Sequence, residues 1–74
     1  MKKVTLTFWS ITYAIKVRKL LLGIGIKSKL IKIDPSLTNE GCAYGVEIAE
    51  AYLLDAVSEL KKRGIKYSLY QGDS

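Results

Sequence analysis

The chain has 74 residues, of which 49% are hydrophobic and 26% are charged, and its 12 Lys and Arg against 7 Asp and Glu give a formal net charge of +5. This length leaves little room for both a core and a deep catalytic pocket. We therefore expect a single domain over residues 1–74 that serves as a binding or carrier protein and is not an enzyme. There is no histidine and one cysteine, Cys42. The usual residues of metal sites, disulfide pairs and histidine-assisted catalysis are therefore missing, and no cofactor is expected.

The positive charge is compatible with nucleic acid, an anionic small molecule or an acidic partner, but the lysines are scattered and a solvated surface accounts for them. The longest uncharged apolar stretch, residues 20–26, is far shorter than the roughly 20 residues that a membrane helix needs. No signal-peptide cleavage pattern follows the N-terminal lysines. We expect a cytoplasmic protein without membrane association, since a lone cysteine fits a reducing compartment.

The first predicted element is a strand over residues 4–9, because apolar side chains alternate there with Thr5 and Thr7. Ser10 is a typical N-cap, and a helix is predicted beyond it. The apolar stripe of this helix comprises Tyr13, Ala14, Val17, Leu20, Leu21 and Ile24. Gly23 and Gly25 predict where the helix ends.

Residues 26–34 predict a second strand with imperfect alternation, followed by a polar turn and a third strand over residues 43–48. A second helix is predicted from a stripe of Ala49, Leu53, Ala56, Val57 and Leu60. Gly64 ends it, and residues 65–70 form a fourth strand. The sequence Gly-Ile-Lys recurs at residues 25–27 and 64–66, each time after a helix, which indicates two similar βαβ halves.

Two such halves combine into a ferredoxin-like α+β domain, with a four-stranded antiparallel sheet and two helices on one face. Alternation gives the open face a mostly polar set: Thr5, Thr7, Trp9, Glu47, Lys66, Ser68 and Tyr70. Trp9 and Tyr70 are candidates for a contact surface, although a place at the edge of the core is slightly favoured for them. A homodimer through this face or through an edge strand stays open as an alternative.

Cys42 lies where the polar turn leads into the third strand, a position that fits a reactive thiol and a structural cysteine about equally. Around it the chain resembles a family of small proteins described as selenium or sulfur carrier protein-like. The resemblance rests on residues 5–14, on Leu30-Ile31 followed by Pro35, on a cysteine seven residues after that proline, and on Gly64-Ile65. Where the family pattern has arginine after the proline and glycine after the cysteine, this chain has Ser36 and Ala43.

The resemblance implies that Cys42 carries a persulfide or selenide between donor and acceptor proteins of sulfur or selenium metabolism. Pro35, Asn39, Gly41 and Ala43 are the predicted supporting loop, and backbone N–H groups in the turn from Asn39 to Ala43 would stabilise the anion.

Two alternatives remain. The first is a regulatory or assembly module that binds a partner protein through its open sheet or an edge strand, with an incidental cysteine. The second, less favoured, is an RNA-recognition domain, because residues 41–46 faintly match its third-strand motif. That motif would rest on Tyr44 alone, and if Tyr44 points inward with Val46 and Ile48 no stacking platform exists.

Overall fold

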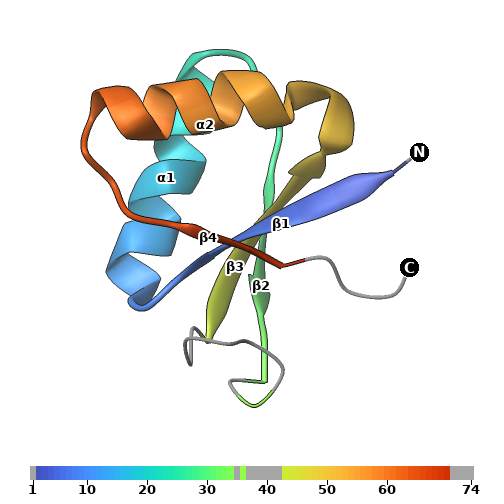
Figure 1. Cartoon of the computed structure of the whole chain (residues 1–74), viewed down its shortest axis with the longest axis vertical. Helices are drawn as coiled ribbons and strands as arrows, with labels where there is room; N and C mark the ends of the chain where they lie inside the picture. Colours follow the sequence, from blue (N-terminus) through green and yellow to red (C-terminus); the bar gives the residue numbers. More distant parts are fainter. Residues whose placement is uncertain (1, 35, 37–42, 71–74) are drawn as a thin grey trace.

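The computed structural model describes residues 2–34, 36 and 43–70 (Figure 1). The described elements are β1 (Lys3–Phe8), α1 (Ile11–Gly23), β2 (Lys29–Lys32), β3 (Tyr44–Ala49), the short 3-10 helix η2 (Glu50–Tyr52), α2 (Leu53–Lys62) and β4 (Ser68–Tyr70). The strands lie in the order β2-β3-β1-β4, and every neighbouring pair is antiparallel. This βαββαβ arrangement confirms the predicted ferredoxin-like fold.

The hydrophobic core lies between the sheet and the two helices. β1 contributes Val4, Leu6 and Phe8, which share one face because side chains alternate along a strand. The other core residues are Ala14, Val17, Leu21, Ile26, Val46, Ile48, Ala56, Leu60 and Ile65. Since α1 and α2 bury their side chains in this single cluster, both helices cover the same face of the sheet.

Both helices end in the same backbone motif, which explains the Gly-Ile-Lys repeat. Gly25 and Gly64 have φ values of +85° and +69°, in the left-handed region that favours glycine. The residue after each glycine, Ile26 or Ile65, donates its N–H to the carbonyl five residues earlier, at 2.8 and 3.0 Å. Both isoleucines are buried in the core. The repeat thus encodes two C-terminal helix caps of the Schellman type, each anchored by an isoleucine.

The N-terminus of α1 lies where predicted, because Ser10 Oγ accepts a hydrogen bond from the Thr12 N–H at 3.1 Å. Other predicted boundaries are wrong. Ala49 ends β3 and pairs with Lys3, rather than beginning the second helix. β2 and β4 are shorter than predicted, since Ile26 and Ile65 belong to the helix caps and not to the strands.

The sheet face away from the helices is less polar and less open than predicted. Thr5 and Thr7 are only 6% and 1% exposed, and Thr7 Oγ1 donates a hydrogen bond to the Ser68 carbonyl at 3.1 Å. Gly45 lies beside both threonines, and the side chains of Thr5 and Ile33 extend into the space that a larger residue would fill there. Ile33 is also buried, so this face has a small apolar centre of its own.

Neither described helix combines the length and apolar character that a membrane crossing requires.

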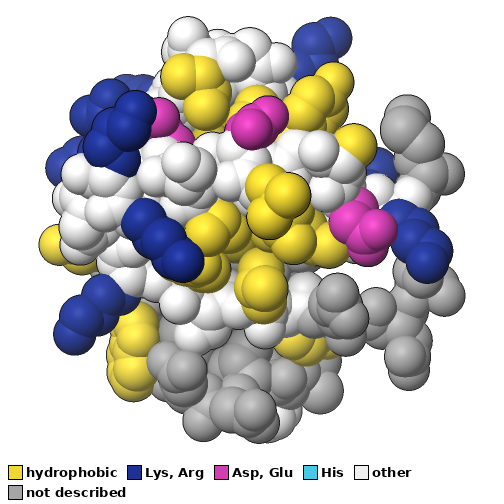
Figure 2. All heavy atoms as spheres, turned by 45° about the horizontal axis from the view of Figure 1, so that its top comes forward, with side chains coloured by type: hydrophobic (Ala, Val, Ile, Leu, Met, Phe, Trp, Pro, Cys, Tyr) yellow, Lys and Arg dark blue, Asp and Glu magenta, His cyan; other side chains and the backbone are white. Residues whose placement is uncertain are grey.

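On the face shown in Figure 2, Lys and Arg side chains lie mainly towards the margin, while hydrophobic side chains gather across the middle.

Candidate functional site

The described residues nearest to Cys42 in the chain lie at one end of the sheet. The Ile33 N–H donates to the Ala43 carbonyl at 2.8 Å, which continues the β2–β3 ladder one step past its last paired residues. Ala43 itself is half-buried. Cys42 and the predicted supporting residues Pro35, Asn39 and Gly41 lie outside the described residues. The structure therefore shows that the segment containing Cys42 begins and ends at the same end of the sheet, where Ile33 and Ala43 pair.

A short turn begins the segment on the β2 side. The Ser36 N–H and hydroxyl both donate to Asp34 Oδ1, at 3.0 and 2.9 Å. The backbone N–H first, and the hydroxyl second, hold the pKa of Asp34 below its ordinary value, because both stabilise the charged carboxylate. This is the arrangement of an Asx turn, in which an aspartate side chain replaces a backbone acceptor.

The hydrogen bonds of this turn can be tested by titrating Asp34. We expect Ser36→Ala to raise the pKa of Asp34 part of the way towards its ordinary value, because the stronger donor, the backbone N–H, remains. The folded pKa is the lower one, so the turn contributes stability above the unfolded pKa of Asp34 and loses it as pH falls through the folded pKa. A carboxyl-carbon NMR titration of both proteins measures this. An identical Asp34 titration in the variant would mean that the hydroxyl bond does not form in solution.

Trp9 lies at the same end of the sheet as Ala43. β1 and β3 pair Phe8 with Tyr44, and continuing this register by one residue places Trp9 opposite Ala43. The β1–β4 register, continued past Thr7 and its partner, places Lys66 on the other side of Trp9. Ala43 and Lys66 therefore lie on opposite sides of Trp9.

Two adjoining hollows meet at Trp9, and we call them together the Trp9 cleft. The first, of about 510 Å³, is lined by Thr7, Trp9, Ile65, Lys66, Tyr67, Ser68 and Leu69. The second, of about 310 Å³, is lined by Phe8, Trp9, Tyr13, Gly64, Ile65 and Lys66. The cleft forms where the β1–β4 pairing ends, at Thr7 and Ser68. Beyond this point β1 leads through Ser10 into α1, whereas β4 is reached from the end of α2 at Gly64, so the two chain segments separate.

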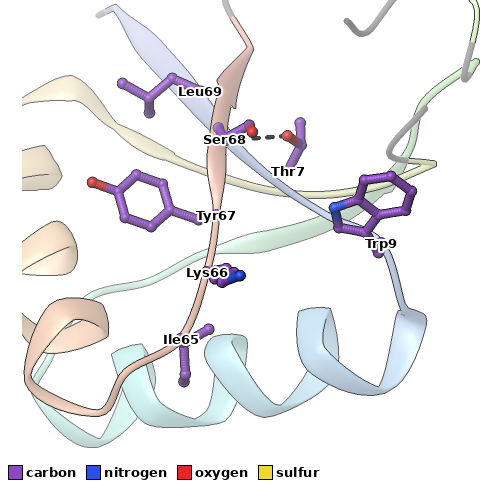
Figure 3. Close-up of a pocket in the computed structure, with 7 residues that line it drawn as sticks. All are labelled: Thr7, Trp9, Ile65, Lys66, Tyr67, Ser68 and Leu69. Carbon is purple, nitrogen blue, oxygen red and sulfur yellow. Dashed lines mark hydrogen bonds between the residues drawn. The ribbon is translucent and has the colours of Figure 1, made fainter. Parts of the chain in front are cut away.

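Figure 3 shows how side chains are arranged in the first hollow. Trp9 and Thr7 lie on one side of the chain that leads into β4, and Tyr67 and Leu69 point to the other side. Lys66 is seen nearly end-on, on the chain between Ile65 and Tyr67. The indole of Trp9 therefore forms one wall of the hollow, and the β4 chain with Lys66 forms the opposite one.

The sequence-predicted surface residues lie on different faces. Trp9 is 69% exposed, so it is a surface residue and not part of the core edge. Tyr70 is half-buried and pairs with Thr5, on the face away from the helices. Tyr44 packs against the helix-side core together with Val46. Tyr44 thus points inward, which is the condition under which the sheet offers no base-stacking platform.

Sequence reasoning did not bring Tyr13 and Lys66 together with Trp9. The helical spacing predicts Tyr13 in the apolar stripe of the first helix, yet Tyr13 is 52% exposed and lines the cleft. Strand alternation predicts Lys66 on the open face and assigns it no neighbour. The available signal is their spacing, since Trp9 lies one residue before the N-cap Ser10 and Tyr13 three residues after it.

The electrostatics of the cleft are simple. Among the described residues that line it, Lys66 is the single charged side chain. No group of three or more acidic, cysteine or histidine side chains suited to a metal occurs in the described part of the chain. The cleft is therefore an apolar, partly aromatic hollow with one cation.

Comparison with known protein families gave one match. The sequence model of the family described as "Putative Se/S carrier protein-like" matches residues 3–71. Comparisons with curated proteins and with solved structures each gave no significant match. The family match spans every described strand and helix, from the start of β1 to the end of β4.

Proposed function

We propose that this chain, which belongs to the Se/S carrier protein-like family, carries one sulfur or selenium atom on Cys42 between a donor and an acceptor protein. The observation that carries the proposal is the family match across residues 3–71, in a chain whose single cysteine lies within the matched range. Donor and acceptor are proteins of sulfur or selenium metabolism, as the family description implies.

The chemistry needs one thiolate. The Cys42 thiolate attacks the terminal sulfur of a donor persulfide; a new S–S bond forms, the donor S–S bond breaks, and the donor leaves as a thiolate. The terminal sulfur keeps its proton, and no net oxidation occurs, since one persulfide replaces another. A donor selenylsulfide reacts in the same way and yields Cys42–S–SeH. An acceptor thiolate then takes the terminal atom by the same exchange, and Cys42 returns to the thiolate.

A single cysteine suits this task better than disulfide exchange. Because the chain has no second cysteine, no intramolecular disulfide can displace the cargo once it is bound. The sheet end at Ile33 and Ala43 supports the proposal further, since paired strands hold both ends of the segment that contains Cys42. A thiol borne on such a strand connection is a suitable place for exchange with another protein.

Intact-protein mass spectrometry tests the proposal. Wild type and Cys42→Ser are incubated without reductant, once with a cysteine desulfurase and cysteine or selenocysteine, and once with inorganic polysulfide. We expect wild type to gain one sulfur or selenium atom that dithiothreitol removes, and Cys42→Ser to gain none, because serine cannot form a persulfide. Absence of any gain in wild type, while an alkylating reagent labels Cys42 in the folded protein, would refute the carrier function.

A partner-binding module with an incidental cysteine is the second candidate, and the exposure of Trp9 favours it. A large exposed aromatic beside an apolar hollow is typical of a protein-binding surface. Under this alternative, wild type takes up no chalcogen from either donor, while Cys42→Ser binds partners as wild type does.

A further inference from the structure

We propose that the Trp9 cleft docks the protein that exchanges sulfur or selenium with Cys42, by receiving an apolar side chain from an acidic segment of that protein. The proposal rests on the carrier function and adds to it the surface and the chemistry of the partner.

The first argument is position. Trp9 lies opposite Ala43 in the continued β1–β3 register, and Ala43 is the residue that follows Cys42 in the chain. Atom transfer requires the partner's reactive sulfur to reach Cys42, so the partner must cover this end of the sheet. The Trp9 cleft is a hollow that described residues form at that end.

The second argument is the exposed aromatic surface. Trp9 and Tyr13 are 69% and 52% exposed, although both border hollows that a side chain can fill. Tryptophan and tyrosine are the residue types that contribute most to binding at protein interfaces, because they bury a large area at little cost in side-chain entropy. Thr7 and Ser68 lie at the floor of the larger hollow, where their hydrogen bond holds the two strands together.

The third argument is charge. Lys66 is the single charged residue among the described residues of the cleft, and the whole chain carries +5. A carboxylate next to the inserted apolar side chain would pair with Lys66, and the field of the protein would attract an acidic segment. A second copy of the chain fits less well, because two molecules of charge +5 repel each other.

A peptide-binding experiment tests the chemistry of the site, with Trp9 as the reporter because it is the sole tryptophan. The probe is an acetylated hexapeptide with Phe-Leu at its centre and Asp-Glu on both sides. We expect Trp9 emission to shift to the blue and acrylamide quenching to fall as the peptide binds. Lys66→Glu should weaken binding on the order of tenfold at low salt, and added salt should weaken wild-type binding.

The control is Lys27→Glu, which makes the same change of charge on an exposed lysine beyond the other end of β2. We expect it to bind the peptide nearly as wild type does. Equal weakening by both variants would overturn the proposal, because only net charge would then matter. An unshifted Trp9 spectrum at millimolar peptide would overturn it as well. So would a blue shift of wild type with rising protein concentration alone, which assigns the cleft to a second copy.

Transfer kinetics separate this inference from the carrier function. Trp9→Ala should load from inorganic polysulfide at the wild-type rate, since that donor needs no docking and this change leaves the charge around Cys42 as it is. From a persulfidated cysteine desulfurase, Trp9→Ala and Lys66→Glu should load on the order of tenfold more slowly. Equal rates from the enzyme, or loading of wild type by polysulfide alone, would overturn docking and leave the carrier function standing. No loading of wild type from either donor would overturn both.

Discussion

Gly45→Ala is expected to lower the free energy of unfolding by about 1–3 kcal/mol, the usual cost of overpacking. A Cβ atom at this position would lie 2.6 Å from Thr5 Cγ2 and 2.8 Å from Ile33 Cδ1. Thr5 cannot easily move, because β-branched side chains have few rotamers and this one is 6% exposed in the middle of β1. Ile33 can relieve its own contact by moving its side chain, but the contact with Thr5 requires a shift of the strand backbone.

Gly23→Ala is the matched control, since it adds the same methyl group where the structure places nothing within 4 Å. Gly23 ends α1, and alanine is favoured over glycine in a helix by about 0.5–1 kcal/mol, an advantage that is smaller at a helix end. The two Gly→Ala changes should thus have opposite signs.

Thermal unfolding followed by circular dichroism measures both variants. In a domain of this size each kcal/mol changes Tm by about 4–8 °C. We expect Gly45→Ala to melt well below wild type and Gly23→Ala at or above it. A wild-type Tm for Gly45→Ala would mean that the face away from the helices accommodates a side chain between Thr5 and Ile33 without strain.

The fold was predictable because its signals are local and agree with one another. Ser10 as an N-cap and the glycines at 25 and 64 act through their own backbone neighbours, so the sequence shows both ends of α1 and the end of α2. The alternation in β1 assigns Leu6 and Phe8 to one face regardless of what packs on them. Because crossover connections are right-handed, a chain with two helices and four strands in this order can adopt only a few topologies.

The predictions are wrong at residues whose secondary structure or burial depends on contacts with residues distant in the sequence. Ala49 suits a helix as well as a strand, and its pairing with Lys3 decides the outcome. Thr5 and Thr7 look like solvent-facing residues, but they are buried, and the side chains of Thr5 and Ile33 meet over Gly45. Such burial comes from contacts across strands, which the order of residues along one strand does not reveal.

The Trp9 cleft was not predictable for the same reason. Its walls come from the start of α1 and from the chain between α2 and β4, which are more than fifty residues apart in sequence. The register between β1 and β4 brings Trp9 and Lys66 together, and that register follows from the pairing of Thr7 with Ser68. Cys42, by contrast, could be singled out from the sequence alone, since it is the one cysteine.

Phe8 and Trp9 are adjacent aromatic residues whose truncation should affect stability to very different extents. Phe8 is 1% exposed and is among the largest fully buried side chains, whereas Trp9 is 69% exposed. Phe8→Ala is expected to cost about 3–5 kcal/mol, from lost burial and the cavity left behind. Trp9→Ala should change stability by about 0.5 kcal/mol or less, as is usual for surface substitutions.

The difference decides how each variant can be used. At about 0.05–0.15 kcal/mol per residue, a chain of this length is stable by roughly 4–11 kcal/mol, so Phe8→Ala removes a large part of that reserve. Denaturant titration measures both variants, with the Phe8→Ala midpoint far below the wild-type one. A Trp9→Ala midpoint close to wild type would show that any loss of transfer in this variant comes from the cleft and not from unfolding. A loss of 2 kcal/mol or more in Trp9→Ala would contradict the exposed position of the indole, because so exposed a side chain has little burial to lose.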